Sequence, residues 1–402
     1  MNRTEINTFL AYGFNFGSLA NNTNYKILKE IKIKDNTNNI EELLNSGISL
    51  FKSLFTKYGK SDNYVIPMSG GLDSRTLQIG LLSHGVPREN ILNITFGSPG
   101  NLDYEIGKGL SRKTQVKNKC INLSKINLSF SDMVKSAENH TFPISFIDNY
   151  YNRLILNYNT EKVKTLVGYM GDPIAGSHSI EKLTWEDSIN IFFRKHIDYT
   201  EVRLFNSNFR PREILPKKPL LGNNINYYDQ LDFILRQEYF VKPIVLIDEE
   251  IYDSPFLNKD WIEFFLSLDS FYRRNRFLFK KILEKVDGTI FNYYSEENYG
   301  FPTNYPEIMV FPSKLKRKLL KVLKSKGLLN YNNIFENYID MEEHIRSGAL
   351  RGLVCDAITS LHSRNLIDRV DVMELYNKHL NGYDYTKSLI RLTNLEIFLS
   401  SR

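Results

Sequence analysis

The sequence predicts an α/β protein in which helices cover both faces of a parallel sheet, followed by a mostly helical C-terminal part. Two apolar stretches carry this expectation, residues 65–68 before a glycine turn and residues 91–97. Each is followed by a helical pattern, over residues 75–82 and 103–114, and alternation of strands with helices is typical of parallel sheets. From Glu181 onward, apolar residues recur mostly at helical spacing.

The remaining elements complete this pattern along the chain. Residues 8–33 predict extended or irregular backbone, and residues 40–58 carry apolar side chains at helical spacing. A short third strand is expected over residues 120–123, and one or two helices over residues 130–157. Residues 164–172 predict a further strand that runs into a second glycine-containing turn. Ligands of such sheets bind where the strands end at their carboxyl side.

The composition bounds the class of protein. With 402 residues, 42% hydrophobic and 24% charged, the chain has the make-up of a soluble globular protein. Its net charge of +6 suits an anionic substrate without requiring nucleic acid. Two cysteines, Cys120 and Cys355, predict neither a disulfide framework nor a metal cluster. The first residues lack a signal-peptide core and no apolar run approaches a membrane span, so we expect a cytoplasmic protein.

The stretch from Ser69 to Ser74, Ser-Gly-Gly-Leu-Asp-Ser, lies between a predicted strand and a predicted helix. Its glycines let the backbone turn tightly and present N–H groups, and a glycine loop at a helix N-terminus binds anions readily. The loop is too short for the pattern with four residues between glycine and Gly-Lys. It resembles the pyrophosphate loop of ATP pyrophosphatases, which form AMP and pyrophosphate from ATP. The alternative is an ordinary strand-turn-helix corner.

The whole chain resembles the synthetase domain of the asparagine synthase family, which includes the β-lactam synthetases. Four stretches carry the resemblance in the family's order, and the loop just described is the first. The second is residues 168–172, at the family's glycine-rich motif. The third is residues 250–257, which resemble its E-x-R-x-P-F-L-D stretch, followed by residues 280–283, which resemble its K-x-x-L stretch. Residues 379–398 resemble the closing helices. The resemblance implies an adenine nucleotide alpha hydrolase-like sheet that uses ATP and Mg²⁺.

Several residues depart from the family's pattern. Members with an N-terminal glutaminase carry a nucleophilic cysteine after Met1, whereas residue 2 here is Asn. We therefore expect residues 1–39 to be a remnant of, or a replacement for, that domain, residues 40–402 to be the synthetase domain, and no glutamine hydrolysis. Residues 171–176, Gly-Asp-Pro-Ile-Ala-Gly, differ from the usual Gly-Asp-Glu-Leu-Phe-Gly-Gly. This difference falls on the substrate side of the expected site.

The position of these motifs predicts a nucleotide and metal site at the ends of the strands. Asp73 and Asp172 each end a strand-turn element, so both can face one crevice and bind Mg²⁺. The alternatives are a helix N-cap for Asp73 and a turn-capping role for Asp172. The adenine is expected between the first two strand ends. The expected nucleotide-binding residues are Pro67, Met68, Ser69, Gly70, Gly71, Asp73, Ser74, Thr95, Phe96, Gly168 and Gly171.

Three residues are candidates for catalysis. Lys280 stands three residues before Leu283, as the lysine does in the family's K-x-x-L stretch, and would stabilise a tetrahedral oxyanion. The alternative for Lys280 is a surface lysine, and Lys281 is expected in solvent. Tyr169, a Tyr also in β-lactam synthetases, could help deprotonate an amine if paired with a carboxylate, for which Glu201 is a candidate by loose spacing analogy. The alternative for Tyr169 is pocket lining.

The expected activity is that of an ATP-dependent amide-forming ligase. It would adenylate a small-molecule carboxylate, release AMP and pyrophosphate, and transfer ammonia or another amine, which a separate protein could supply. A tRNA-modifying ATP pyrophosphatase is one alternative, disfavoured by the lack of paired catalytic cysteines. A catalytically silent nucleotide-binding homologue is the other, disfavoured because Ser69 and Asp73 are retained. Neither a membrane nor nucleic acid is an expected partner. The basic amphipathic stretch 314–326 favours a solvated helix face over a membrane or nucleic-acid patch.

Overall fold

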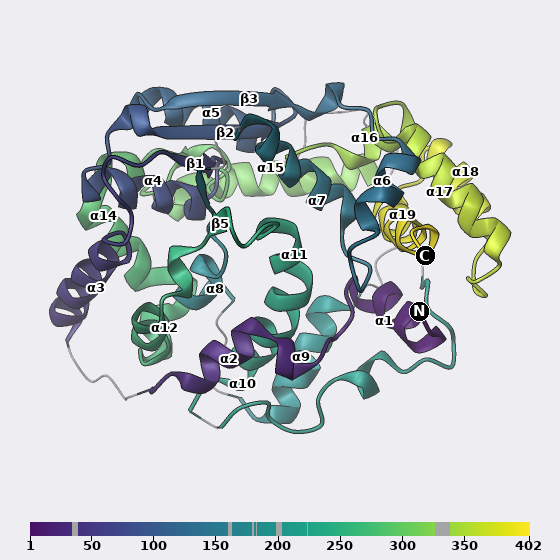
Figure 1. The fold of residues 1–402 in the computed structure, drawn as a ribbon, viewed down its shortest axis with the longest axis horizontal. Coiled ribbons are helices and arrows are strands. Elements are labelled where there is room, and N and C mark those ends of the chain that lie inside the picture. The colour runs from purple at the N-terminus through teal and green to yellow at the C-terminus, as the bar shows by residue number, and fades with distance from the viewer. Residues whose placement is uncertain are drawn as a thin grey trace.

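A computed structural model describes residues 1–33, 39–159, 163–178, 181, 183–197, 203–222, 224–325 and 338–402, apart from the side chains at 307 and 321–325. Its central feature is a five-stranded sheet in the order β3-β2-β1-β4-β5 (Figure 1). All four strand pairs are parallel. The strands are β1 (Tyr64–Pro67), β2 (Ile91–Gly97), β3 (Lys117–Asn122), β4 (Lys164–Leu166) and β5 (Tyr252–Asp253).

The strand order reverses beside β1, and this reversal creates the crevice in which the site lies. From β1 the chain moves outward to β2 and β3 through α4 (Leu72–His84) and α5 (Leu102–Thr114). It then returns to the other side of β1 through α6 (Phe130–Ala137) and α7 (Phe146–Arg153). Because such crossovers are right-handed, the two pairs of helices cover opposite faces of the sheet. The α/β expectation is confirmed, and the C-terminal ends of β1 and β4 flank a topological switch point.

Close packing of α3 (Ile40–Leu54) and α4 supports the loop after β1. A Cβ atom added at Gly80 of α4 would lie 2.0 Å from the Phe55 ring, so only glycine lets the two segments approach this closely. The first three residues of β1 are buried, as expected for a strand covered on both faces. The position of the loop is therefore fixed by the protein core on both sides.

Beyond β4 the chain is mostly helical, as the sequence predicts. A two-stranded antiparallel hairpin of β6 (Tyr294–Ser295) and β7 (Phe301–Pro302) interrupts the helices. The helices of this part are α8 (Gly171–Ala175), α9 (Trp185–His196), α10 (Tyr227–Leu231), a π-helix (Asp232–Val241), α11 (Lys242–Val245), α12 (Lys259–Leu266), α13 (Ser270–Arg273), α14 (Phe277–Phe291), α15 (Glu307–Ser325), α16 (Met341–Arg346), α17 (Arg351–Arg364), α18 (Val372–Leu380) and α19 (Thr386–Ser400). Single 3-10 turns lie at Leu19–Asn21, Arg88–Asn90, Leu123–Lys125, Leu154–Tyr158, Pro211–Ile214, Pro255–Leu257 and Arg274–Arg276. No helix in the described part of the chain is long and apolar enough to cross a membrane.

The expectation of irregular backbone over residues 8–33 is wrong. That stretch contains the second half of α1 (Arg3–Tyr12) and all of α2 (Thr23–Glu30). The start of α1 is fixed by a capping box in which Asn2 and Glu5 bond each other's backbone N–H, and its end by Gly13 in the left-handed region at φ 82°. These capping signals are local, and the aromatic residues between them hide the helical spacing.

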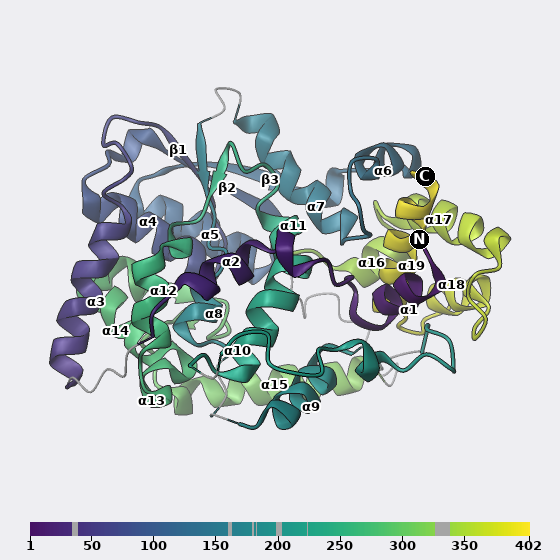
Figure 2. The same cartoon turned by 60° about the horizontal axis from the view of Figure 1, so that its bottom comes forward.

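Both N-terminal helices pack against the rest of the protein. The side chain of Arg391 in α19 donates to the carbonyl oxygens of Phe9 and Leu10, so α1 lies beside the C-terminal helices (Figures 1 and 2). The Glu238 carboxylate accepts hydrogen bonds from the first N–H groups of α2. The segment expected as a separate remnant is thus joined to the π-helix and to α19. The boundary placed at residue 39 follows residues 34–38, which lie outside the described residues.

Candidate functional site

The loop after β1 presents backbone N–H groups, and one of them is already bound to an anion. The Gly70 N–H donates to Oδ1 of Asp103 at 2.6 Å. The Gly71 N–H donates to Ser69 Oγ at 3.2 Å, and Ser69 Oγ lies 3.1 Å from Ser74 Oγ. Burial raises the pKa of Asp103, and the Gly70 bond opposes that rise. The carboxyl group of Asp103 therefore takes up the Gly70 N–H, one of the groups that the sequence predicts for phosphate binding.

Asp73 and Asp172 meet in the crevice between β1 and β4. Asp73 is half-buried in the first turn of α4, whose N-cap residue is Gly71 and has no side chain to cap the helix. Oδ1 of Asp73 and Oδ1 of Asp172 are both buried without a hydrogen-bond partner. Burial and then the Asp172 charge raise the pKa of Asp73 well above its ordinary value, against the opposing charge of Arg276. The pair presents hard oxygen atoms of the kind that bind Mg²⁺, and the Arg276 guanidinium lies beside them.

Glycine residues of the β4 turn make this approach possible. A Cβ atom on Gly168 would lie 2.3 Å from the Asp73 Cβ, and one on Gly171 would lie 2.9 Å from Asp73 Oδ1. The intervening Met170 has a left-handed φ of 66°, which is uncommon for a residue with a side chain. Because Gly168 and Gly171 have no side chains, Asp73 fits against the β4 turn. The Asp73 and Asp172 carboxylates can therefore lie side by side.

Arg276 is the cation of the carboxylate pair, and the sequence analysis missed it. Its guanidinium donates to Asp172 Oδ2 at 2.7 Å and to Glu297 Oε1 at 2.5 Å. Burial opposes its charge, but the charges of Asp172 and Glu297 outweigh burial and raise the pKa of Arg276. Asn275 and Arg276 both adopt left-handed φ values, 53° and 59°. Strain of this kind costs about 1–3 kcal/mol per residue and is concentrated at functional sites.

A buried ion pair holds the segment that carries Asp172. Arg273 Nη1 donates to Asp229 Oδ2 at 2.5 Å, and Arg273 Nε donates to the Ile174 carbonyl oxygen at 3.2 Å. The Gly176 Cα approaches the Arg273 backbone so closely that an added Cβ would lie 2.2 Å from its carbonyl oxygen. The turn that ends β4 is therefore fastened to α10 and α13, and Asp172 with it.

A cavity of about 330 Å³ opens onto the loop and the Asp73 carboxylate. Its far wall is the π-helix, a form that is rare and frequent at functional sites. There His178 Nδ1 lies 2.9 Å from Asp232 Oδ2, and Arg236 lies 3.7 Å from Asp232 Oδ1. Its lining residues are Pro67, Ser69, Asp73, Ser74, Asn152, Val167, Gly168, Tyr169, Met170, Pro173, His178, Arg236, Gln237, Val241 and Val245. The cavity therefore extends from the predicted phosphate-binding loop to a wall of mixed basic and apolar side chains.

The expected adenine residues do not all line this cavity. Pro67 does, whereas Met68 and Thr95 are buried beside β2 and Phe96 packs edge-on against Tyr338. The Ser98 N–H donates to the Tyr338 carbonyl oxygen at 2.8 Å. A segment from the C-terminal part therefore crosses the end of β2, and no sequence pattern predicts this contact.

Lys280 does not contact the carboxylate pair directly; Glu297 and Arg276 lie between them. Its Nζ is 3.3 Å from Glu297 Oε1, the same oxygen that Arg276 contacts. Although burial opposes it, Arg276 and Lys280 lower the pKa of Glu297. Lys280 also lines a second cavity of about 530 Å³, together with Phe271 and Phe277. Lys281 is exposed and lies over the Phe277 ring.

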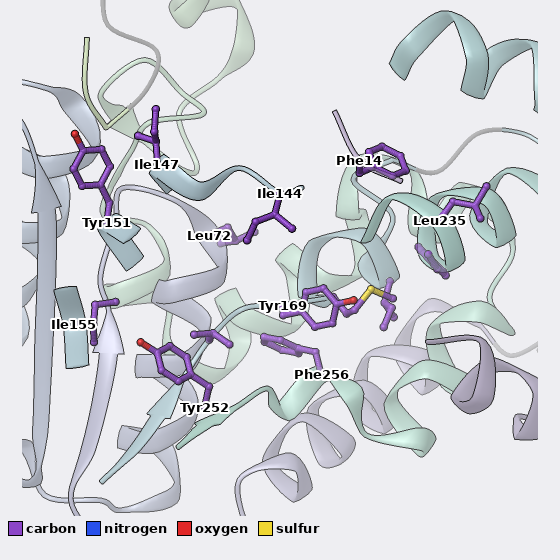
Figure 3. Close-up of a cluster of buried hydrophobic side chains, with 14 of the residues drawn as sticks. Phe14, Leu72, Ile144, Ile147, Tyr151, Ile155, Tyr169, Leu235, Tyr252 and Phe256 are labelled. Atoms are coloured by element: carbon purple, nitrogen blue, oxygen red, sulfur yellow. The ribbon is translucent and has the colours of Figure 1, made fainter. Parts of the chain in front are cut away.

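Tyr169 is part of the cavity wall and of the core. Its hydroxyl accepts a hydrogen bond from Asn24 Nδ2 at 2.7 Å, and its ring lies near Phe256 (Figure 3). Burial first, and then the Glu238 charge, raise the pKa of Tyr169 well above its ordinary value. That direction keeps the phenol protonated at neutral pH. Glu201, the carboxylate suggested for it, lies outside the described residues, and Glu238 is the carboxylate near Tyr169.

Comparison with known proteins gives limited information. Neither a protein-family model nor a curated protein sequence matches the chain. Solved structures do match, among them an NH3-dependent NAD synthetase from Campylobacter jejuni in complex with a nitrate ion. That structure is 14% identical, with a TM-score of 0.25, and the match covers 40% of this chain and 80% of that one. The functional argument therefore depends on the site itself.

Proposed function

We propose that this chain is an ATP-dependent ligase that activates a carboxylate as its adenylate, releases pyrophosphate, and passes the acyl group to ammonia or another amine. One observation carries the proposal. The carboxylates of Asp73 and Asp172 are both half-buried, each has one buried oxygen without a hydrogen-bond partner, and they lie beside a glycine loop whose Gly70 N–H already donates to a carboxyl group. A metal-bound nucleoside triphosphate would bring a divalent cation to the carboxylate oxygens and phosphate oxygens to the loop N–H groups.

The charges of the site favour a divalent cation. Asp73, Asp172 and Glu297 contribute three negative charges when ionised, and Arg276 and Lys280 contribute two positive ones, which leaves a net charge of −1. Mg²⁺ is usually bound by one or two carboxylates together with substrate phosphates. Asp73 and Asp172 would hold it, and it would supply charge neutralisation of the departing pyrophosphate.

The chain's own residues would perform the remaining work. The loop from Ser69 to Ser74 would bind phosphate through its N–H groups. The phosphate would replace the Asp103 carboxylate as the acceptor of the Gly70 N–H. Arg276 would keep Asp172 oriented toward the cavity. The carboxylate to be activated would lie in the cavity, between the loop and the apolar side chains of Val241 and Val245. This arrangement holds the acid next to the nucleotide, and positioning of this kind lowers the barrier for transfer.

The second step requires a positive group near the developing oxyanion. Lys280 remains our candidate, because Glu297 ties it to Arg276 at the edge of the carboxylate pair. Tyr169 and Glu201 remain candidates for proton removal from the amine, although the raised pKa of Tyr169 favours a neutral wall residue. The two cysteines, in β3 and α17, pack against Tyr104 and Tyr376, which does not support sulfur transfer.

The proposal is tested by the products formed from ATP. The protein is incubated with Mg²⁺-ATP, ammonium and a panel of small carboxylic acids, and nucleotides are separated by ion-exchange chromatography. We expect AMP and pyrophosphate, together with acid-dependent exchange of labelled pyrophosphate into ATP. Formation of ADP and phosphate would refute the proposal. Asp73→Asn is the control, since activity that survives it would come from a contaminant or from another site.

A further inference from the structure

Helix α15 (Glu307–Ser325) exposes its apolar side chains instead of burying them. Ile308 is 81% exposed and Phe311 is 60% exposed, and Leu315 and Leu319 are likewise exposed. These four residues recur every three or four positions, so they form one stripe along the helix. We name Ile308, Phe311, Leu315 and Leu319 the apolar stripe. The sequence predicts a solvated face for this basic stretch, and the structure adds an apolar face that is equally exposed.

The side of α15 that packs on the protein is mostly polar. Val310 is 1% exposed, and Ser313, Lys314, Arg317 and Leu320 are half-buried. Arg317 lies over the Tyr299 ring, with its guanidinium carbon 5.1 Å from the ring centroid. A helix that belongs to a protein core places its apolar face inward, and α15 does the reverse. Among the residues that the structure describes, burial of apolar surface therefore does not account for the stripe.

Charge on α15 identifies the partner. The helix carries Lys314, Lys316, Arg317, Lys318, Lys321 and Lys324 against the single acid Glu307, a balance of +5 in a chain whose total is +6. By helical spacing, Lys316 and Lys318 flank the apolar stripe on its two sides, and both are exposed. Apolar residues bordered by lysines are the pattern of helices that lie in the interface of anionic membranes.

We propose that α15 is a membrane-surface helix that docks this protein on anionic lipid headgroups, with the apolar stripe inserted between them. The helix of 19 residues would lie parallel to the surface, since it is too polar to span it. Figure 2 shows α15 along the lower edge of the molecule in that view. A second copy of this chain is disfavoured because two helices of the same charge repel each other. Nucleic acid is disfavoured because phosphate contacts give the apolar stripe no role.

The test is cosedimentation of the full chain with vesicles of phosphatidylcholine alone or mixed with phosphatidylglycerol. At about 0.1 M salt, where the screening length is about 10 Å, we expect binding to the anionic vesicles only, and release as salt rises. Neutralising Lys316 and Lys318 together, as Lys316→Gln with Lys318→Gln, should weaken partitioning roughly 30-fold. The matched control, Lys52→Gln with Lys259→Gln, changes the net charge equally at exposed positions elsewhere and should bind as the parent does.

The apolar stripe is tested separately by Phe311→Ser, which should weaken partitioning roughly tenfold. Tyr383→Ser is its control, since Tyr383 is 61% exposed and lies outside α15. Failure of the parent to bind anionic vesicles, or equal binding by Phe311→Ser, would overturn the proposal. So would a concentration-dependent dimer, or capture by an acidic protein or by RNA, that replaces vesicle binding. Pyrophosphate exchange in solution should be unchanged in Phe311→Ser. The vesicle assay therefore tests the membrane proposal alone, and the exchange assay tests the ligase proposal alone.

Discussion

Replacement of Asp73 by Asn should separate stability from ligand binding. Asp73 lies half-buried beside Asp172, and loss of water around its carboxylate, together with the Asp172 charge, raises its pKa. A raised folded-state pKa means that ionised Asp73 costs stability, and the cost appears as the pH rises from the ordinary carboxyl pKa toward the folded value. Asn has the same shape without the charge. We therefore expect Asp73→Asn to be at least as stable as the parent at pH 8, and to lose less stability than the parent as the pH rises.

The same substitution should abolish stabilisation by Mg²⁺-ATP. A ligand at 100 times its Kd stabilises a protein by about 2.7 kcal/mol. With about 2.1 cal/mol/K per residue, the 402 residues give an unfolding entropy of about 0.8 kcal/mol/K. The parent Tm should therefore rise by about 3 °C when Mg²⁺-ATP is saturating, because 2.7 divided by 0.8 is about 3. Asp73→Asn should show no rise.

Thermal unfolding followed by circular dichroism, with and without Mg²⁺-ATP, measures both effects. The control is Asp253→Asn, which removes a carboxylate from β5 of the sheet. Asp253 is 2.8 Å from Lys57 and lines a separate cavity near the start of β1. That variant should lose some stability and keep the 3 °C rise. If Asp73→Asn also keeps the rise, the carboxylate pair does not hold the metal and our reasoning about the site is wrong.

Three further substitutions test how the site is built. Lys280→Ala should remove about 3–4 kcal/mol of oxyanion stabilisation and so lower turnover by two to three powers of ten. Lys281 is exposed, so Lys281→Ala should release pyrophosphate at a near-normal rate. Arg273→Leu should lower the free energy of unfolding, measured in urea, by about 3–5 kcal/mol, because it leaves the buried Asp229 carboxylate without its cation. Arg274→Leu removes an exposed ion pair with Glu181 and should lower it by less than about 1 kcal/mol. Gly168→Ala should abolish pyrophosphate exchange without unfolding the chain, because its Cβ would lie 2.3 Å from the Asp73 Cβ and displace the proposed metal ligand. Normal exchange would contradict the close approach.

Much of the sheet could be predicted because its signals are local. The β2 boundaries agree with the sequence prediction, and α5 differs from it by one residue at its start. Apolar runs of strand length and glycine turns act within a few residues of the chain. The helices α1 and α2 were missed although their caps are also local, because aromatic residues in that stretch obscure the spacing of the apolar face.

The sequence by itself determined that this chain has a glycine loop between a strand and a helix, and that Asp73 and Asp172 follow two strands of one parallel sheet. It did so because strand ends meet at one edge of such a sheet. Only the tertiary structure decided which cation lies beside them. Arg276 is 104 residues away from Asp172 along the chain, and a strained turn directs it inward. The structure likewise decided which face of α15 is exposed, since helical spacing fixes that residues share a face but not what that face contacts.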